Sequence, residues 1–191
     1  MWLVCDEPAA NLTLRLETFL WTSLSPTSRA DTAASCPGPG AAVALQLPLS
    51  DLLATGRCHP GSYDQQRLEY CLVRATLLPG EGPPLHMADL HAPPLALSTL
   101  LPPQLSVTVT GLSNTVPAGR YTQTFAIRLT TTSIALYVWL ESGRWDGRFS
   151  ENGFIAVDEE TELLFHSEQF LTVEQLQLEI SVRAYRKPQW N

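Results

Sequence analysis

The sequence is poor in charged residues and has no long apolar run. Only 16% of its residues are charged, against 45% hydrophobic, a balance that argues against a disordered chain and suits a globular one. Lysine and arginine number 12 against 19 acidic residues and form no basic stripe, so nucleic acid is not an expected partner. No stretch reaches the roughly 18 apolar residues of a membrane-spanning helix, so no contact with a membrane is expected either.

The first residues lack the marks of a secretory signal peptide. Asp6 and Glu7 follow soon after Met1 and leave no apolar stretch of roughly 7–15 residues. Asn11-Leu12-Thr13 is nevertheless an N-glycosylation sequon, which has meaning only in the secretory pathway. The two observations agree if the chain is the tail of a longer secreted or lysosomal protein. We therefore predict Asn11 as a glycosylation site.

The cysteines lie in the first half of the sequence and show no zinc-binding spacing. Four cysteines allow three pairings, between which the sequence does not choose. A bridge from Cys58 to either Cys71 or Cys36 would close a short loop and stabilise the fold by about 3 kcal/mol, leaving Cys5 over. The alternative is that the cysteines are reduced and buried.

Residues that could carry chemistry are few. His86 and His91 lie in a proline-rich stretch with no third ligand nearby, so no metal site is predicted. The acidic cluster at 158–162 separates two predicted strands and is interpreted as a solvated turn. No Gly-rich phosphate loop precedes a helix. We predict no catalytic residue, no metal and no cofactor.

The first half of the sequence alternates between strand patterns and breaks. Strands are predicted at Leu12–Trp21, Ala41–Leu47 and Arg67–Leu78, where apolar residues recur at every second position. Ser23–Gly40 is predicted as a mobile loop, and Pro48–Leu53 as a helical turn with Ser50 as its cap. Seven prolines in 79–103 exclude a central strand there and leave room for an edge strand at most.

The second half reads as a succession of short strands separated by turns. This spacing is typical of a β-sandwich. The sequence thus predicts an all-β fold of two immunoglobulin-like sandwich domains, residues 1–103, incomplete at the N-terminus, and residues 104–191. The strands expected in the second domain are 105–109, 121–130, 134–141, 154–157, 161–166 and 176–185.

The segment 135–157 is the most informative part of the chain. In the first strand of this segment, the side chains of both alternating sets are apolar, so we expect both faces of the strand to be covered. Trp139 is expected in the core or at an interface with a neighbouring domain. Asn152-Gly153 supplies two residues that tolerate positive φ, as a hairpin turn requires. The aromatic residues are the best candidates for contact with another molecule: Tyr137, Trp139, Trp145, Phe149 and Phe154.

The order VWLE, then GRFSENGF, resembles the C-terminal immunoglobulin-like domain of animal β-mannosidases of glycoside hydrolase family 2. The family pattern has Asp where this chain has Glu141 and Glu151. LTLRLETFLWTSLSP (12–26) and LSDLLATGRC (49–58) are similar to the preceding sandwich domain. In this motif we expect Arg148 to pair with Glu151 or a backbone carbonyl, and Asn152 to shape the turn. The residues taken as its structural core are Trp139, Gly147, Arg148, Phe149, Asn152, Gly153 and Phe154.

The resemblance implies a lysosomal enzyme that removes terminal β-linked mannose from glycoprotein oligosaccharides. Its two catalytic carboxyls would lie on a (β/α)₈ barrel, which this chain is too short to form. We therefore predict a non-catalytic portion, inactive alone, that buttresses the barrel and has the rest of the glycosidase as its partner. One alternative is a free-standing sugar-binding module using Tyr137, Trp139 and Trp145. The other is an adhesion or scaffold protein, which the lack of cysteine in 104–191 disfavours.

Overall fold

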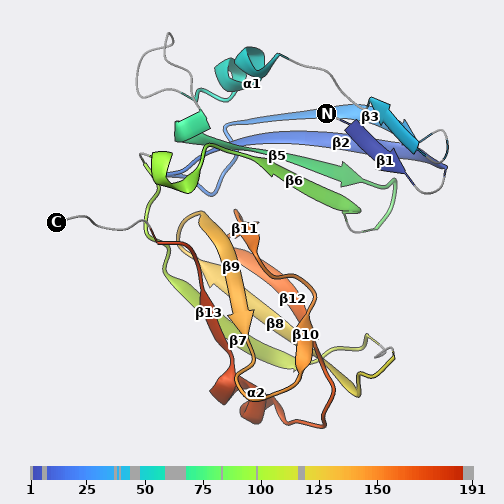
Figure 1. Ribbon diagram of the computed structural model, residues 1–191, viewed down its shortest axis with the longest axis vertical. Helices are drawn as coiled ribbons and strands as arrows, with labels where there is room; N and C mark the ends of the chain where they lie inside the picture. Colours follow the sequence, from blue (N-terminus) through green and yellow to red (C-terminus); the bar gives the residue numbers. More distant parts are fainter. Residues whose placement is uncertain are drawn as a thin grey trace. The chain divides into compact units, whose positions relative to one another are not determined.

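Antiparallel strands are the main elements of the computed structural model, and they confirm the predicted all-β fold (Figure 1). The chain divides into two compact units, Met1–Leu100 and Leu101–Asn191. None of the helices in the described part has the length and apolarity to cross a membrane. The residues that the structure describes are 2–5, 8–36, 38, 40–43, 48–58, 68–82, 84–97, 99–115 and 119–186.

The first unit is built on a four-stranded antiparallel sheet of order β3-β2-β5-β6. Helix α1 lies over one face of this sheet (Figure 1). A separate two-stranded ribbon pairs β1 with β4. The strands are β1 (Trp2–Cys5), β2 (Ala9–Leu20), β3 (Ser28–Cys36), β4 (Gly40–Val43), β5 (Cys71–Leu78) and β6 (His86–Leu90). The helices are α1 (Leu49–Thr55) and the short 3₁₀ turns η1 (Leu68–Tyr70) and η2 (Pro94–Ala96).

Three details of the first unit correct the sequence analysis. Much of the predicted loop 23–40 is strand β3, which pairs with β2 from Thr18↔Ser28 to Ala9↔Cys36. Helix α1 begins after Pro48 with no side-chain cap, so Ser50 is not its cap. The third predicted strand begins only at Cys71, after η1. The predicted strand 41–47 is described as far as Val43, and positions 44–47 lie outside the described residues.

The second unit is a sandwich of two sheets. One has the order β10-β12-β8-β7 and the other β11-β9-β13. The buried side chains between them form one cluster that includes Phe125, Val138, Leu140 and Phe165. The strands are β7 (Leu105–Leu112), β8 (Gln123–Thr131), β9 (Ala135–Glu141), β10 (Gly147–Phe149), β11 (Phe154–Ala156), β12 (Glu160–Ser167) and β13 (Ser181–Arg183).

The predicted strand 176–185 is wrong in its first half, which is helix α2 (Val173–Glu179). The apolar residues Val173, Leu176 and Ile180 recur at spacings of three and four, and this stripe faces the core while Leu178 is 85% exposed. Thr172 accepts a hydrogen bond from the Gln175 amide, and the Gln175 side chain accepts one from the Thr172 amide. This reciprocal capping box marks a helix start that strand periodicity conceals.

The segment between β9 and β11 is more than a hairpin turn. After β9 the chain crosses to the other sheet as β10, which pairs with β12, and then returns as β11 to pair with β9. The GRF part of GRFSENGF is thus a strand of the opposite sheet. Figure 1 shows β10 and β11 on different sheets of this unit.

Candidate functional site

Exposed aromatic side chains gather on the outer face of β9. We define the aromatic strip as Tyr137 and Trp139 of β9 with Tyr185, which follows β13. Tyr137 is 41% exposed and Trp139 is 44% exposed. The Tyr185 ring stands edge-on to that of Tyr137, with the centroids 6.5 Å apart. Trp139 is therefore not a core residue of the second unit. The rest of the second unit does not cover both faces of β9.

A β-bulge decides which side chains of β9 face outward. The pairs Phe154↔Val138 and Ala156↔Ala135 place three residue steps of β9 against two of β11. Tyr137 takes a positive φ of 52° at this point. The extra residue resets the alternation, so that Val138 and Leu140 point into the core and Trp139 points outward.

A charged pair borders the aromatic strip. Arg183 of β13 lies opposite Trp139 in register, and its guanidinium contacts the Glu141 carboxylate at 2.8 Å. An exposed apolar centre bordered by paired charge is the arrangement found at protein interfaces, and exposed Trp and Tyr also stack on sugar rings.

Trp145 belongs to the internal packing rather than to the aromatic strip. It is partly buried against the core of its unit, and its indole Nε1 donates to the Gln175 carbonyl at 3.3 Å. The Arg144 guanidinium lies 4.7 Å above its ring. These contacts tie the turn after β9 to helix α2, and they leave Trp145 as a structural side chain.

Gly147 and Phe149 fill a closely packed part of the β10–β12 pair. A Cβ at Gly147 would come within 2.5 Å of the His166 carbonyl oxygen and of the Phe165 ring. Phe149 is buried, with its ring centroid 4.9 Å from that of Phe165. Position 147 therefore accepts only glycine unless the neighbouring atoms shift.

Asn152 acts through its side chain and not through positive φ. Its Oδ1 accepts from the Leu140 amide at 2.7 Å, and its Nδ2 donates to the Leu140 carbonyl at 3.1 Å. Gly153 has the positive φ, 75°, and its amide donates to the Val138 carbonyl. Together these bonds continue the pairing of β11 with β9. The following Phe154 is partly buried against the core.

The expected pairing of Arg148 with Glu151 or with a backbone carbonyl is not found among the described residues. Arg148 is exposed on β10, and no ion pair or hydrogen bond to Glu151 occurs among the described residues. Its role in the motif stays a prediction.

The histidines and the acidic cluster do not assemble a site. His91 lies edge-on to the buried Trp21 ring at 5.9 Å, while His86 is exposed on β6. Asp158, Glu159 and Glu162 are exposed. Within the described ranges, no group of three or more His, Cys, Asp or Glu side chains is arranged to hold a metal ion.

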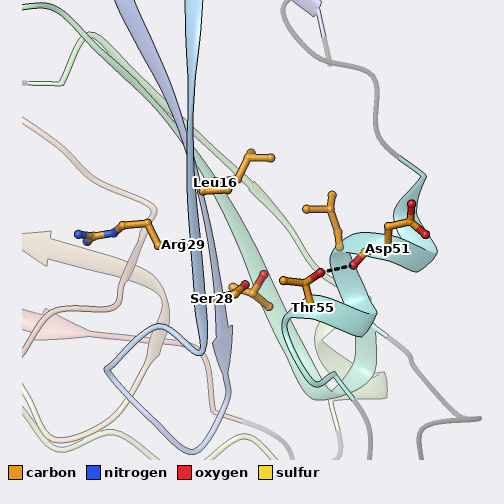
Figure 2. A pocket seen from close by; sticks show the side chains of 8 residues that line it. Leu16, Ser28, Arg29, Asp51 and Thr55 are labelled. Carbon is orange, nitrogen blue, oxygen red and sulfur yellow. Dashed lines mark hydrogen bonds between the residues drawn. The ribbon is translucent and has the colours of Figure 1, made fainter.

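A shallow hollow of about 170 Å³ lies between helix α1 and strands β2 and β3 (Figure 2). Figure 2 shows the Arg29 side chain directed away from the helix, and Thr55 hydrogen-bonded to the Asp51 carbonyl. Retaining hydrolysis needs two carboxyls about 5–5.5 Å apart, and Asp51 is the one carboxylate in the lining. The lining residues are Leu16, Thr18, Ser28, Arg29, Ala30, Asp51, Leu52 and Thr55.

Charged side chains cross the opposite face of this sheet in a row. Arg29, Glu17, Arg74 and Asp89 are successive cross-strand neighbours on β3, β2, β5 and β6. Arg29 contacts Glu17 at 2.8 Å, and Arg74 makes two bonds of 2.8 Å to Asp89. The alternation of sign compensates the charges, so the row holds the four strands in register without forming a free charged site.

A third ion pair lies beside this row. Arg15 donates two hydrogen bonds of 2.9 Å to Asp31. The guanidinium lowers the pKa of the Asp31 carboxyl. Cross-strand pairing of this kind explains how the polar, exposed β3 holds its place at the sheet edge.

A disulfide joins Cys58, after α1, to Cys71, the first residue of β5. It is one of the two bridges considered for Cys58. Cys36 is disulfide-bonded as well, so the described cysteine side chains are not reduced thiols. The bridge closes a short loop, since the two cysteines are separated by 13 residues in the sequence, and it ties α1 to the sheet.

Comparison with known protein families relates the second unit to mannosidases. Residues 100–187 match the family model of the mannosidase Ig-fold domain. No curated protein sequence matches the chain.

A solved structure adds a likeness of fold. The crystal structure of β-D-mannosidase from Dictyoglomus thermophilum matches 98% of this chain with a TM-score of 0.60 and 10% sequence identity. The chain spans only 20% of that protein's length. At this identity the likeness concerns the fold alone. The family match and the two-sheet sandwich cover the same residues, so the second unit is similar to the Ig-fold domains of mannosidases in both sequence and fold.

Proposed function

We propose that the chain is the non-catalytic C-terminal immunoglobulin-like portion of a β-mannosidase of glycoside hydrolase family 2, and that it buttresses the catalytic barrel. The parent enzyme would hydrolyse terminal non-reducing β-D-mannose from glycoprotein oligosaccharides in the lysosome. The observation that carries the proposal is the mannosidase Ig-fold match over residues 100–187. The likeness of fold to a bacterial β-mannosidase over 98% of the chain supports it.

The aromatic strip is the surface that we assign to this buttressing role. Tyr137 and Trp139 expose large apolar area at low conformational cost, the property that makes Trp and Tyr frequent anchors of protein interfaces. The Arg183–Glu141 pair gives the patch a polar border. In the parent enzyme these two rings would be covered by another part of the protein.

A free-standing carbohydrate-binding module is the second candidate, and the same exposed rings favour it. A Trp and a Tyr on one face of a strand can stack on sugar rings. The two candidates differ in what covers Trp139: a protein surface or an oligosaccharide.

The first test uses native protein from its source. Antibodies raised against the purified chain precipitate the antigen, and the precipitate is assayed with a chromogenic β-mannoside, with the purified chain assayed in parallel. We expect activity in the precipitate and none in the chain alone. A precipitate without activity, containing only a polypeptide of this chain's 21.0 kDa mass, would contradict the proposal.

Calorimetry with mannose-type oligosaccharides separates the two candidates. Binding by the purified chain that is lost in Trp139→Ala and kept in Phe170→Ala would favour the sugar-binding module. Phe170 is the matched control because it is an exposed aromatic residue, 80% accessible, outside the strip.

A further inference from the structure

We propose that Asn11 carries an N-linked oligosaccharide. Asn11-Leu12-Thr13 is the one Asn-x-Ser/Thr sequence in the chain. In the folded unit Asn11 is exposed, whereas its neighbour Leu12 is buried in the core. The acceptor side chain therefore points to solvent in the finished fold, and a glycan on it would not disturb the packing of the strand.

The backbone at Asn11 is shaped as a bulge. The pairs Ala9↔Cys36 and Leu12↔Ala34 set three residue steps of β2 against two of β3. Asn11 has a positive φ of 59° within this bulge. A bulge leaves its extra residue out of the regular pairing and projects the side chain from the sheet, which gives a bulky modification room.

Gly80 also leaves space beside Asn11. Gly80, in the connection between β5 and β6, lies beside Asn11, since a Cβ built there would be 3.7 Å from the Asn11 carbonyl oxygen and 3.9 Å from its Cβ. Gly80 has no side chain to cover the amide. On this side Asn11 therefore faces backbone and not a side chain.

The disulfides give an independent indication of compartment. The Cys58–Cys71 bridge and the disulfide at Cys36 belong to the same unit as Asn11. Such bonds form in oxidising compartments, the secretory pathway above all, where N-glycosylation sequons are also modified. The sequon and the disulfides therefore point to one location.

The modification is a group transfer from a lipid-linked oligosaccharide diphosphate. A bond forms between Asn11 Nδ2 and C1 of the first sugar, and the bond from C1 to the diphosphate oxygen breaks. The amide loses one proton and the lipid diphosphate leaves with the electron pair. A glycan at this position would keep the surface around Asn11 and Gly80 free of protein contacts. The inference goes beyond the proposed function and does not depend on it.

An alternative explanation for Asn11 is purely conformational, because Asn tolerates positive φ better than most residues. Four chains separate the two explanations: wild type, Thr13→Ser, Thr13→Val and Asn11→Gly. Thr13→Ser keeps the sequon, Thr13→Val removes it with little change of shape and leaves Asn11 in place, and Asn11→Gly keeps the tolerance of positive φ without an acceptor.

The full chain is expressed behind a cleavable signal peptide in mammalian cells, and both secreted and cell-retained material are treated with an amidase that removes N-linked glycans. We expect wild type and Thr13→Ser to shift in mobility on treatment, with Asn11 converted to Asp in the peptide map. Thr13→Val and Asn11→Gly should show no shift. Wild-type chain that shows an unmodified Asn11 peptide in both fractions would overturn the proposal, whatever the outcome of the mannosidase assay.

Discussion

At the scale of single residues, Asn152 shows how the VWLE…GRFSENGF motif stabilises the sandwich. Its amide group binds both backbone groups of Leu140 and so takes the place of a strand neighbour. Gly153 then continues the pairing at Val138. The motif residue works as part of the sheet, which is why one side chain can matter far from any reactive group.

We predict that Asn152→Ala lowers the free energy of unfolding of the second unit by about 1–2 kcal/mol, because it leaves the amide and carbonyl of Leu140 without these partners. Asn152→Asp keeps the acceptor and loses the donor, so its effect should be intermediate. Glu151→Ala, at the exposed neighbouring position, is the control. Urea unfolding measures all three, and equal midpoints for Asn152→Ala and Glu151→Ala would refute this role.

Residue roles were predictable from the sequence only in part. Gly147 and Gly153 stand out in the motif, and the structure gives each a physical reason: close approach at Gly147 and positive φ at Gly153. The exposure of Trp139 was not predictable, because both alternating sets of side chains on this strand are apolar and the sequence does not show which set is left uncovered. The mode of action of Asn152 was hidden for a similar reason, since its bonds go to a strand twelve residues earlier.

At the scale of elements, β9 has one core face and one exposed aromatic face. We predict that Trp139→Ala changes the free energy of unfolding of the purified chain by less than about 1 kcal/mol, as surface substitutions usually do. Leu140→Ala, which empties a core position on the same strand, should cost about 2–5 kcal/mol. The comparison is made by chemical denaturation. A loss of several kcal/mol in Trp139→Ala would place the ring in the core after all.

Helix α2 depends on its capping box. We predict that Thr172→Ala destabilises the second unit by about 1 kcal/mol, since the Gln175 amide loses its acceptor. Leu178→Ala, at an exposed position of the same helix, serves as the control and should leave stability nearly unchanged.

A second readout of the capping box is the titration of Glu174. Its pKa is lowered by a hydrogen bond from its own backbone amide and, secondarily, by the Thr172 side chain. In Thr172→Ala the pKa, followed by NMR, should rise toward its ordinary value. An unchanged titration together with unchanged stability would show that the cap contributes nothing.

Elements with strong alternation were predictable, and elements held by other forces were not. Strands β2, β8 and β12 alternate clearly because one face is buried. Strand β3 lies at a sheet edge and is held by ion pairs, so its small polar residues resemble a loop. Helix α2 presents leucines two apart, which imitates a strand until the capping residues are considered.

At the scale of the whole molecule, the chain consists of two units with separate means of stabilisation. The disulfides belong to the first unit, and the second contains no cysteine. In the described residues, the second unit is a sandwich of two sheets over a single large apolar cluster. We therefore expect loss of a disulfide to affect the two units very differently.

We predict that Cys58→Ala/Cys71→Ala destabilises the first unit by about 3 kcal/mol, the loop-closure contribution expected for a separation of this size. Hydrogen exchange of β2 and β5 amides should become about 100-fold faster, because each 1.4 kcal/mol corresponds to a factor of ten. Exchange in β8 and β12 should not change. Equal acceleration in both units, or none in β2 and β5, would contradict this division of stability.

We propose that the aromatic strip of the second unit is a contact surface within a larger mannosidase. Hydroxyl-radical labelling tests this surface by comparing the purified chain with the native protein that the antibodies precipitate. The exposed Phe170 is the internal control. We expect Tyr137 and Trp139 to be labelled in the purified chain and protected in the native protein, while Phe170 is labelled in both. Equal labelling of Tyr137 and Trp139 in the two samples would contradict it.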